Sequence, residues 1–435
     1  MKSEIPSTKK IKISIDILDE KYLSMIFSHL KINDRLQMEK VCEKWKAGCQ
    51  LMWKNISTFA TGDKKFNVQY GLNRQPNDDD VKNALIKCGE YLNHASFSLS
   101  ENPTILSAIT DYCCNLVSLE LILHANANVN DFTDAFKKMI KLRSINILFV
   151  NNDRKNNYAD EVEDETPHND EKILQSLPID MENISLISDE LRWSKYPDEY
   201  CDDENEVSQF VKILNKFNSL RSLTLSNYEI GENVMDIICL KGSLAYLDLS
   251  KSKLNGPNPA ISNLINLEHL DLSFVGDYID DNVVIEIINS CKYLKYFDLS
   301  MCGEITKASL IKLEKLKNIQ VLLLNEVYDV DDDIVNSLVN LKKFGCSKCD
   351  GVTDVSAMKI IQNSPGLESL ILYYTEITTK TLQYASEVLK KRDNGVKLIV
   401  YTSCDVIKSF DKTDTSSLLD VQRYNDPNGF DTDNY

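Results

Sequence analysis

The sequence predicts an α/β solenoid, in which short strand–helix units stack side by side, preceded by a small all-helical segment. Three observations predict this class. A six-residue apolar pattern recurs along most of the chain, the apolar period between its copies changes to that of a helix, and helical signals cluster ahead of the first copy. With 435 residues, 43% of them hydrophobic, the chain is too long for one ordinary core and too apolar for global disorder.

The recurring pattern is LxxLxL, with Ile, Phe or Val as substitutes. Clear copies start at Leu220, Leu244, Leu267, Leu294, Ile319, Leu341 and Leu367, and weaker ones at Leu92, Leu116, Leu142, Met181 and Val396. From Leu220 onward the copies are 22 to 29 residues apart, which is the spacing of leucine-rich repeats. The predicted fold is therefore an α/β leucine-rich-repeat solenoid, or horseshoe, with an N-terminal all-helical segment.

Each unit reads as a strand followed by a helix. Apolar residues alternate within each copy, as in a strand with one buried face. Between copies they recur at the spacing of one helix face, as in Val284, Ile287, Ile288 and Cys291. Stacking buries these faces and places parallel strands on the inner, concave side. The positions of Cys113, Cys291, Cys302 and Cys349 resemble the cysteine-containing subclass of leucine-rich repeats.

Composition suggests the domain organisation. We expect a flexible N-terminus (1–14), a helical segment (15–57), a linker or first helical cap (58–90), the solenoid (91–405) and a polar tail (406–435). Acidic insertions near 151–172 and 188–207 interrupt the solenoid. Because such stretches bury little apolar area, we expect disordered or loosely attached loops. They either hold a basic partner or are tolerated insertions.

The helical segment shows two apolar sets, the first of them at helical spacing. The first is Leu23, Ile26, Phe27 and Leu30, and the second is Leu36, Val41, Cys42, Trp45 and Cys49. Asn33 or Asp34 can cap a second short helix. Three short helices make too small a core to stand alone, so the segment needs the solenoid or a partner to cover it.

This segment resembles the F-box, through Leu18, Ile26, Phe27, Ser28, Leu30, Asp34, Leu36, Val41, Cys42, Trp45 and Trp53. In F-box and leucine-rich-repeat proteins the F-box docks on the Skp adaptor of a cullin–RING ubiquitin ligase, and the repeats hold the protein to be ubiquitylated. The resemblance implies a Skp adaptor and a cullin scaffold as partners. It implies adaptor contacts at Leu18, Asp19, Ile26, Phe27, Leu30, Leu36, Val41 and Trp45, with Asp19 in place of the family's usual proline. The open alternative is a helical cap over the first repeat.

The sequence shows none of the motifs sought for enzymes and metal sites. The sequence holds no phosphate-loop, dinucleotide, zinc-protease or nucleophile-elbow motif, and its five histidines are dispersed. The lone CxxC at Cys346 and Cys349 fits repeat core positions better than a metal site. We expect no catalytic residue, cofactor, metal or small-molecule substrate.

The overall charge and the apolar runs bear on partners and location. A net charge of −17 argues against nucleic-acid binding. No apolar stretch predicts a membrane span or a signal peptide, so we expect reduced cysteines and a cytoplasmic or nuclear protein.

Two rows of side chains on the inner face are candidates for binding a protein substrate. The third strand position reads Tyr246, His269 and Tyr296, and the fifth reads Asp248, Asp271 and Asp298. An apolar group, Leu323, Ile371 and Tyr373, follows on later strands. We expect this face to meet Lys or Arg flanked by apolar residues, although Asp-Leu-Ser is also a common solvated filler in such repeats.

The sequence therefore predicts a substrate-recognition adaptor of a Skp–cullin–F-box ubiquitin ligase whose substrate is an unknown protein. The alternative is a stand-alone acidic leucine-rich-repeat scaffold that binds a basic protein. Residues 15–53 distinguish the two, because only the first function requires them to contact the Skp adaptor.

Overall fold

The computed structural model describes residues 15–61, 78–99, 104–124, 132, 135–150, 170–192, 209–256 and 259–423. The chain divides into an N-terminal unit, Met1–Ile145 with Ser176–Pro178, and a C-terminal unit, Asn146–Gln175 with Ile179–Tyr435. Within each unit parallel strands follow chain order and alternate with helices. This confirms the predicted α/β leucine-rich-repeat solenoid. Among the described helices, none has the length and apolarity needed to cross a bilayer.

The N-terminal unit begins with helices and continues as a sheet. Its elements are η1 (Ile15–Ile17), α1 (Glu20–Phe27), α2 (Ile32–Met38), α3 (Glu43–Lys54), β1 (Thr58–Thr61), α4 (Asp78–Cys88), η2 (Gly89–Tyr91), β2 (His94–Leu99), α5 (Thr104–Tyr112) and β3 (Ser118–His124). β1, β2 and β3 pair in parallel. The segment 58–90, predicted as a linker or first helical cap, therefore contains both β1, a strand of the sheet, and the helix α4. With Phe59 as its only large apolar residue, β1 is too short to show the repeat pattern.

The helical segment packs tightly because Gly48 lets α3 approach α1. A Cβ on Gly48 would lie 2.9 Å from the Cβ of Leu23. The segment is also tied to the first helix of the repeats. Glu39, at the end of α2, accepts hydrogen bonds from Nε1 of Trp53 on α3 and from Nζ of Lys87 on α4, each at 2.6 Å. The segment is therefore part of the N-terminal unit.

The C-terminal unit holds most of the repeats. Its elements are β5 (Asn183–Arg192), α7 (Gln209–Asn215), β6 (Ser222–Ile230), α8 (Glu232–Cys239), β7 (Tyr246–Asp248), β8 (Lys253–Leu254), η5 (Ile261–Asn263), β9 (His269–Asp271), η6 (Gly276–Tyr278), α9 (Asp281–Ser290), β10 (Tyr296–Asp298), α10 (Lys307–Leu310), η7 (Leu313–Lys315), β11 (Val321–Leu323), α11 (Asp332–Asn336), β12 (Lys343–Gly345), α12 (Asp354–Asn363), β13 (Ser369–Ile371), α13 (Thr379–Lys390), β14 (Leu398–Thr402), α14 (Cys404–Ser409) and β15 (Leu419–Arg423). β4 (Ser144–Val150) and α6 (Asp170–Ser176) each contain one boundary between the units.

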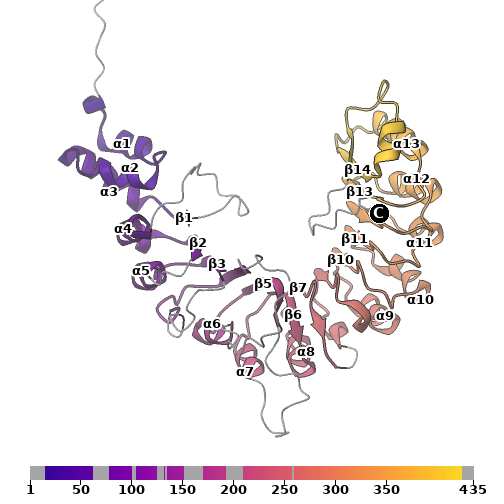
Figure 1. The fold of residues 1–435 in the computed structure, drawn as a ribbon, viewed down its shortest axis with the longest axis horizontal. Coiled ribbons are helices and arrows are strands. Elements are labelled where there is room, and N and C mark those ends of the chain that lie inside the picture. Colours follow the sequence, from indigo (N-terminus) through magenta and orange to yellow (C-terminus); the bar gives the residue numbers. More distant parts are fainter. Residues whose placement is uncertain are drawn as a thin grey trace, which may run out of the picture. The chain divides into compact units, whose positions relative to one another are not determined.

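Within the C-terminal unit the strands line the inner side and the helices the outer side (Figure 1). Neighbouring strands from β5 to β15 pair in parallel, except that β8 pairs only with β6. Every clear copy of the repeat pattern coincides with one of these strands. The tentative copy at Met181 is confirmed, since it leads into β5 and its side chain is fully buried. The inner face of this sheet is where the predicted substrate rows lie.

Three predicted boundaries were wrong. The polar tail predicted from residue 406 contains the end of α14 and all of β15, which pairs with β14. Residues 170–172, assigned to the first acidic insertion, begin α6, and residues 188–192, assigned to the second, complete β5. Arg192 at the end of β5 and the residues of β15 pair with neighbouring strands, which a count of local apolar residues does not register. Residues 151–169, 193–207 and 424–435 lie outside the described part of the chain.

Acidic residues at the helix starts join successive repeats. Asp280 caps its own helix, α9, by accepting a hydrogen bond from the N–H of Val283 at 3.0 Å. The next residue, Asp281, instead accepts from the N–H of Thr306 at 2.9 Å and from the hydroxyls of Thr306 and Ser309, all in the following repeat. We call this link between the starts of two successive helices a clamp. It recurs from Asp332 to Thr353 and Ser356, and from Asp354 to Thr378 and Thr381. Of these four acids only Asp280 caps its own helix, and the other three join one repeat to the next.

Candidate protein-binding surfaces

Three aromatic rings form a continuous stack on the inner face of β7, β9 and β10. Tyr246 pairs in register with His269, and His269 with Tyr296. The ring centroids are 3.9 Å apart in both pairs, with interplanar angles of 9° and 15°. Both faces of the His269 ring are therefore covered, and burial lowers the pKa of His269 to about 4, so its ring is neutral at physiological pH. The structure brings together the whole predicted aromatic row.

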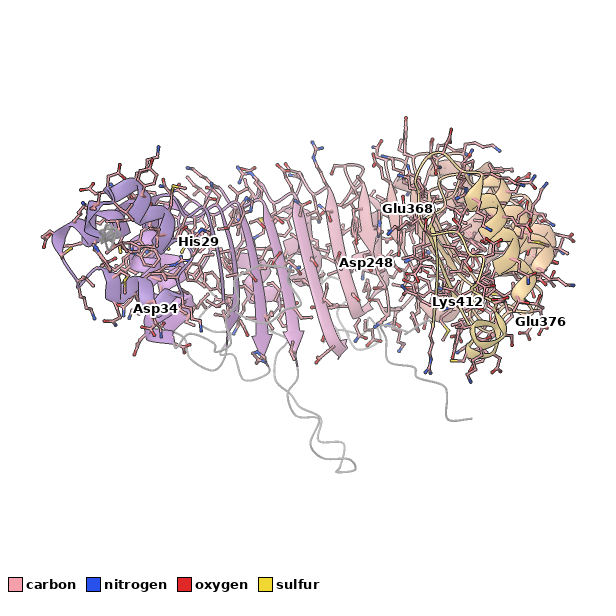
Figure 2. All side chains as sticks on the ribbon, turned by 90° about the horizontal axis from the view of Figure 1, so that it is seen from above. His29, Asp34, Asp248, Glu368, Glu376 and Lys412 are labelled. Atoms are coloured by element: carbon pink, nitrogen blue, oxygen red, sulfur yellow. The ribbon has the colours of Figure 1, made fainter. Side chains whose placement is uncertain are left out.

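A ladder of carboxylates runs beside the stack. Asp248, Asp271 and Asp298 occupy the next inward position on the same three strands, in register. In each case Oδ1 accepts a hydrogen bond at 2.9 Å from the N–H of the serine two residues further on. These aspartates shape the turn that ends each strand and are not idle filler. Figure 2 shows Asp248 over the strand layer.

The carboxyl groups of the ladder have raised pKa values. Burial, followed by the charges of Asp298 and Asp248, raises the pKa of Asp271 to about 7. Burial likewise raises the pKa values of Asp248 and Asp298. Asp298 is only 6% exposed, which corrects its assignment as a substrate contact. The Tyr296 hydroxyl lies 3.4 Å from Oδ2 of both Asp271 and Asp298, and burial with the neighbouring charges raises its pKa. Three like charges about 4.8 Å apart repel one another, and a cation at their Oδ2 atoms would relieve the repulsion.

The expected apolar extension of this face was wrong for two residues. Leu323 is 7% exposed and Ile371 is 3% exposed, so neither offers a contact surface. Between them in register lies Gly345, where a Cβ would be 2.9 Å from Cδ2 of Leu323. The missing side chain lets Leu323 lie flat across β12. Tyr373 is half-buried against Tyr374, with ring centroids 4.2 Å apart.

A third row, which the sequence did not reveal, follows at the ends of the strands. Lys251, Phe274 and Met301 have φ of 61°, 61° and 64°, a left-handed conformation that is costly for bulky side chains. There each N–H donates to a carbonyl of the next repeat, at 2.7, 2.9 and 2.9 Å. Phe274 and Met301 are half-exposed apolar residues in this strained row. Neither is a residue type favoured at positive φ, and the only available signal was their fixed position after Asp-Leu-Ser.

The F-box-like segment presents a second surface. Of its predicted contact residues, Ile26 is 41% exposed and Val41 is 56% exposed, while Leu18, Leu30, Leu36 and Trp45 are half-buried. Phe27 is only 1% exposed and packs on Trp45 with ring centroids 5.3 Å apart. Phe27 is therefore a core residue, which corrects its assignment as a contact. Ile15, Ile17, Tyr22 and Met25 are exposed apolar residues that the prediction omitted.

Asp19 has a definite structural role. It is the N-cap of α1, with φ −75° and ψ 172°, and its Oδ1 accepts a hydrogen bond of 3.0 Å from the N–H of Tyr22. An N-cap carboxylate satisfies a backbone donor that proline in the same place would leave unpaired. The helix start thus gives a reason for aspartate at this position.

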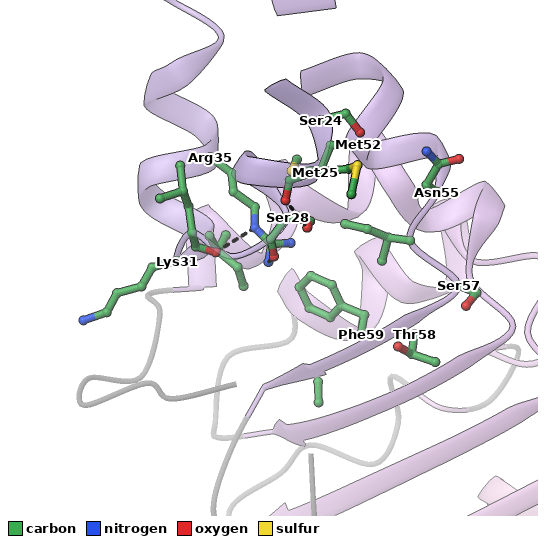
Figure 3. A pocket seen from close by; sticks show the side chains of 14 residues that line it. Ser24, Met25, Ser28, Lys31, Arg35, Met52, Asn55, Ser57, Thr58 and Phe59 are labelled. Carbon is green, nitrogen blue, oxygen red and sulfur yellow. Dashed lines mark hydrogen bonds between the residues drawn. The ribbon is translucent and has the colours of Figure 1, made fainter. Parts of the chain in front are cut away.

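A cavity of about 400 Å³ lies between α1, α2 and β1 (Figure 3). Its lining includes Met25, Phe59 and the buried Arg35, and it contains no carboxylate, imidazole or thiol. The Arg35 guanidinium donates to the carbonyl oxygens of Ser28 at 2.6 Å and Leu30 at 2.8 Å, which closes the turn between α1 and α2. The charged side chains that line the cavity are Lys31 and Arg35.

The buried cysteines of the repeats form hydrogen bonds within the core. The thiol of Cys349 donates to the carbonyl oxygens of Leu324 at 3.4 Å and Val327 at 3.3 Å, and the thiol of Cys302 donates to that of Leu272 at 3.2 Å. Burial raises the pKa of Cys349 to about 12 and that of Cys346 well above its usual value. Within the described residues no group of three or more His, Cys, Asp and Glu is arranged to hold a metal ion.

No protein-family model matches the chain, and no curated protein matches its sequence. Among solved structures it is similar to a chain of the Rad7 and Elc1 complex in yeast, with 14% identity over 92% of each chain and a TM-score of 0.42. An internalin from Listeria monocytogenes has 13% identity over 86% of this chain and 97% of that one, with a TM-score of 0.40. A chain of the mouse RP105/MD-1 complex has 16% identity over 74% and 49%, with a TM-score of 0.36. The fold assignment here rests on the strand register and repeat positions described above.

Proposed function

We propose that this protein is a substrate-recognition adaptor of a Skp–cullin–F-box ubiquitin ligase in the cytosol or nucleus. Its helical segment docks on the Skp adaptor, which joins it to the cullin scaffold, and its repeats hold the protein to be ubiquitylated. The observation that carries the proposal is that the F-box-like residues form three short helices with an apolar outer surface. The chain itself performs no chemistry in this role.

The apolar surface of α1 supports adaptor docking. Tyr22, Met25 and Ile26 lie three and four residues apart, on one face of the helix, and all three are exposed. Val41, in the turn before α3, is exposed as well. The core of the segment is already filled by other residues, including Leu23 and Phe27. These outer side chains are therefore not needed for folding, and exposed apolar clusters of this kind mark interaction sites.

The experiment is a titration of the purified chain with purified Skp adaptor. Ile26→Asp should weaken binding at least about tenfold, because an unpaired carboxylate at an apolar interface costs several kcal/mol. Ile311→Asp, at a similarly exposed position of the C-terminal unit, is the control and should bind like wild type. Because Ile26 lies on the surface, the melting temperatures of both variants should stay close to that of wild type. Equal adaptor affinity for wild type and Ile26→Asp would reject the F-box assignment.

The alternative function is a stand-alone scaffold for a basic protein. The net charge of −17 and the carboxylate ladder favour it, and it assigns the helical segment only a capping role. The titration separates the two functions, because a scaffold has no affinity for the Skp adaptor.

A further inference from the structure

We infer that the inner face of β7, β9 and β10 is the docking site for a basic segment of the recruited protein, whose Lys or Arg side chains bind Asp248 and Asp271, beside the buried Asp298, while apolar neighbours contact Phe274 and Met301. The inference rests on the recruiting role proposed above and names the chemistry of the recruited partner. We call this surface the acidic platform.

The acidic platform combines three rows on the same three strands. The ring stack forms a rigid wall, the carboxylates follow it at the next inward position, and the left-handed residues form the rim. On β11, β12 and β13 the carboxylate position is taken by Leu323, Gly345 and Ile371. The charge is therefore confined to one part of the sheet and is not a general property of the repeats.

The charge of the platform is uncompensated within the described residues. No Lys or Arg there forms an ion pair with Asp248, Asp271 or Asp298. Lys343, on β12, is two strands from Asp298 and acts on it only at long range. Each Oδ1 is held by a serine N–H, and Oδ2 of Asp271 and of Asp298 accepts a long hydrogen bond of 3.4 Å from the Tyr296 hydroxyl. Asp298 is buried, so Asp248 and Asp271 are the carboxylates that can meet a ligand. A cationic side chain is the partner group that restores balance there.

The rim supplies the apolar part of the site. Phe274 and Met301 are half-exposed and held at positive φ, where Asn or Gly would be unstrained. The same left-handed position recurs in other repeats at Asn227, Glu326 and Lys348, so the backbone conformation belongs to the repeat. What is particular to Phe274 and Met301 is that the side chain at this position is apolar. They follow Ser273 and Ser300, whose N–H groups fix Asp271 and Asp298. Apolar and acidic contacts therefore lie side by side, which fits a partner with basic and apolar residues in sequence.

Binding should depend on pH. The titratable groups nearest Asp271 are Asp248, Asp298, Tyr296, His269 and Cys302, with Lys343 further away. His269, the tyrosines and Cys302 stay neutral between pH 6 and 8, so among these groups the carboxyls are what titrate in this range. A cation binds the ionised carboxylates. With the pKa of Asp271 near 7, affinity should rise about tenfold from pH 6 to pH 8.

The test uses the full chain and a fluorescein-labelled peptide of three arginines and three leucines, followed by fluorescence anisotropy. Wild type should bind the peptide, and should bind neither its Arg-to-Glu counterpart nor, with comparable affinity, its Leu-to-Ser counterpart. The triple variant Asp248→Asn, Asp271→Asn, Asp298→Asn should bind at least about tenfold more weakly and lose the pH dependence. Asparagine keeps the Oδ1 acceptor of each turn, so the variant removes charge and retains the fold.

A matched control separates the platform from net charge. Asp236→Asn, Glu304→Gln and Glu314→Gln change the charge equally at exposed positions outside the strands. This control should bind within about twofold of wild type. Phe274→Asn should weaken binding although it relieves backbone strain, so misfolding cannot explain the loss. Ile26→Asp should bind the peptide normally, because it affects the adaptor surface alone.

The outcomes are distinct. No binding of the arginine peptide by wild type, or equal losses in the platform and control triple variants, would overturn the inference. Binding confined to the platform together with failure of adaptor docking would overturn the proposed ligase role and leave the platform standing as the site of a scaffold.

Discussion

Asp332 accepts hydrogen bonds from both the N–H and the hydroxyl of Thr353, at 2.9 and 2.7 Å, and so joins the start of one repeat helix to the start of the next. Thr353 in turn caps α12 through the N–H of Val355. One carboxylate thereby fixes the N-cap of the following helix, and the same arrangement occurs at Asp281 and Asp354. Solenoids gain stability chiefly from such contacts between neighbours.

Removing one clamp should therefore destabilise the array. Asp332→Ala deletes three hydrogen bonds to the next repeat and should lower the free energy of unfolding by about 1–2 kcal/mol. The measurement is urea unfolding followed by circular dichroism. Asp350→Ala, an exposed acid in the same turn region, is the control and should change stability by less than about 0.5 kcal/mol. Similar losses in the two variants would contradict the clamp.

The clamps and the platform should respond to pH in opposite directions. Burial opposes ionisation of Asp332, but hydrogen bonds from Ser356 and Thr353 outweigh it and lower its pKa, so its stabilisation is lost as pH falls through that lowered value. Asp271 has a raised pKa. Its folded form holds a proton that the unfolded chain releases near pH 4, so its ionisation costs stability as pH rises from about 4 through 7.

Asp271→Asn should consequently stabilise the protein at pH 8. The melting temperature should rise by roughly 2 °C or more there and should match wild type at pH 4, where the wild-type carboxyl is protonated. Differential scanning calorimetry at both pH values gives the comparison. A lower melting temperature at pH 8 would mean that Asp271 is stabilising, contrary to its burial among like charges. An Asp271→Asn variant that is more stable than wild type but binds the peptide more weakly is the result expected if Asp271 belongs to a binding site.

The N-cap of α1 gives a prediction for adaptor docking. Asp19→Pro should destabilise the N-terminal unit by about 1 kcal/mol, because the N–H of Tyr22 loses its acceptor. It should nevertheless strengthen Skp adaptor binding, because an apolar ring replaces a charge at the interface. Asp19→Ser keeps the cap without the ring and should leave both quantities near wild type. Weaker adaptor binding by the proline variant than by the serine variant would place Asp19 outside the interface.

The cysteines should behave as core residues. Cys349→Ser should cost about 1–3 kcal/mol, because a shorter, more polar group replaces a buried thiol held by two carbonyls. Cys42→Ser, at an exposed position, should cost little. In native protein, iodoacetamide should modify Cys42 and Cys114 and spare Cys349, as mass spectrometry can show. One zinc per chain by elemental analysis would contradict the core assignment.

Local pattern was sufficient to predict the repeats. Strand and helix periods are properties of a few consecutive residues, so LxxLxL located the clear strands from β6 to β13. Because each repeat adds one strand in the same register, the pattern also predicted that Tyr246, His269 and Tyr296 form one row. Both predictions depended on spacing along the chain, and spacing is what a solenoid preserves.

What lies between repeats was decided only by the tertiary structure. β1 and β15 are strands because a neighbouring strand pairs with them, although their own residues carry little apolar pattern. Leu323 is buried because Gly345, on the next strand, leaves space for it. Phe27 is a core residue because Trp45 packs on it from α3. The identity of a residue thus fixes its own structural preference. Its burial and its pKa depend on other groups, which lie more than twenty residues away in the repeats or on another helix. No local pattern encodes these groups.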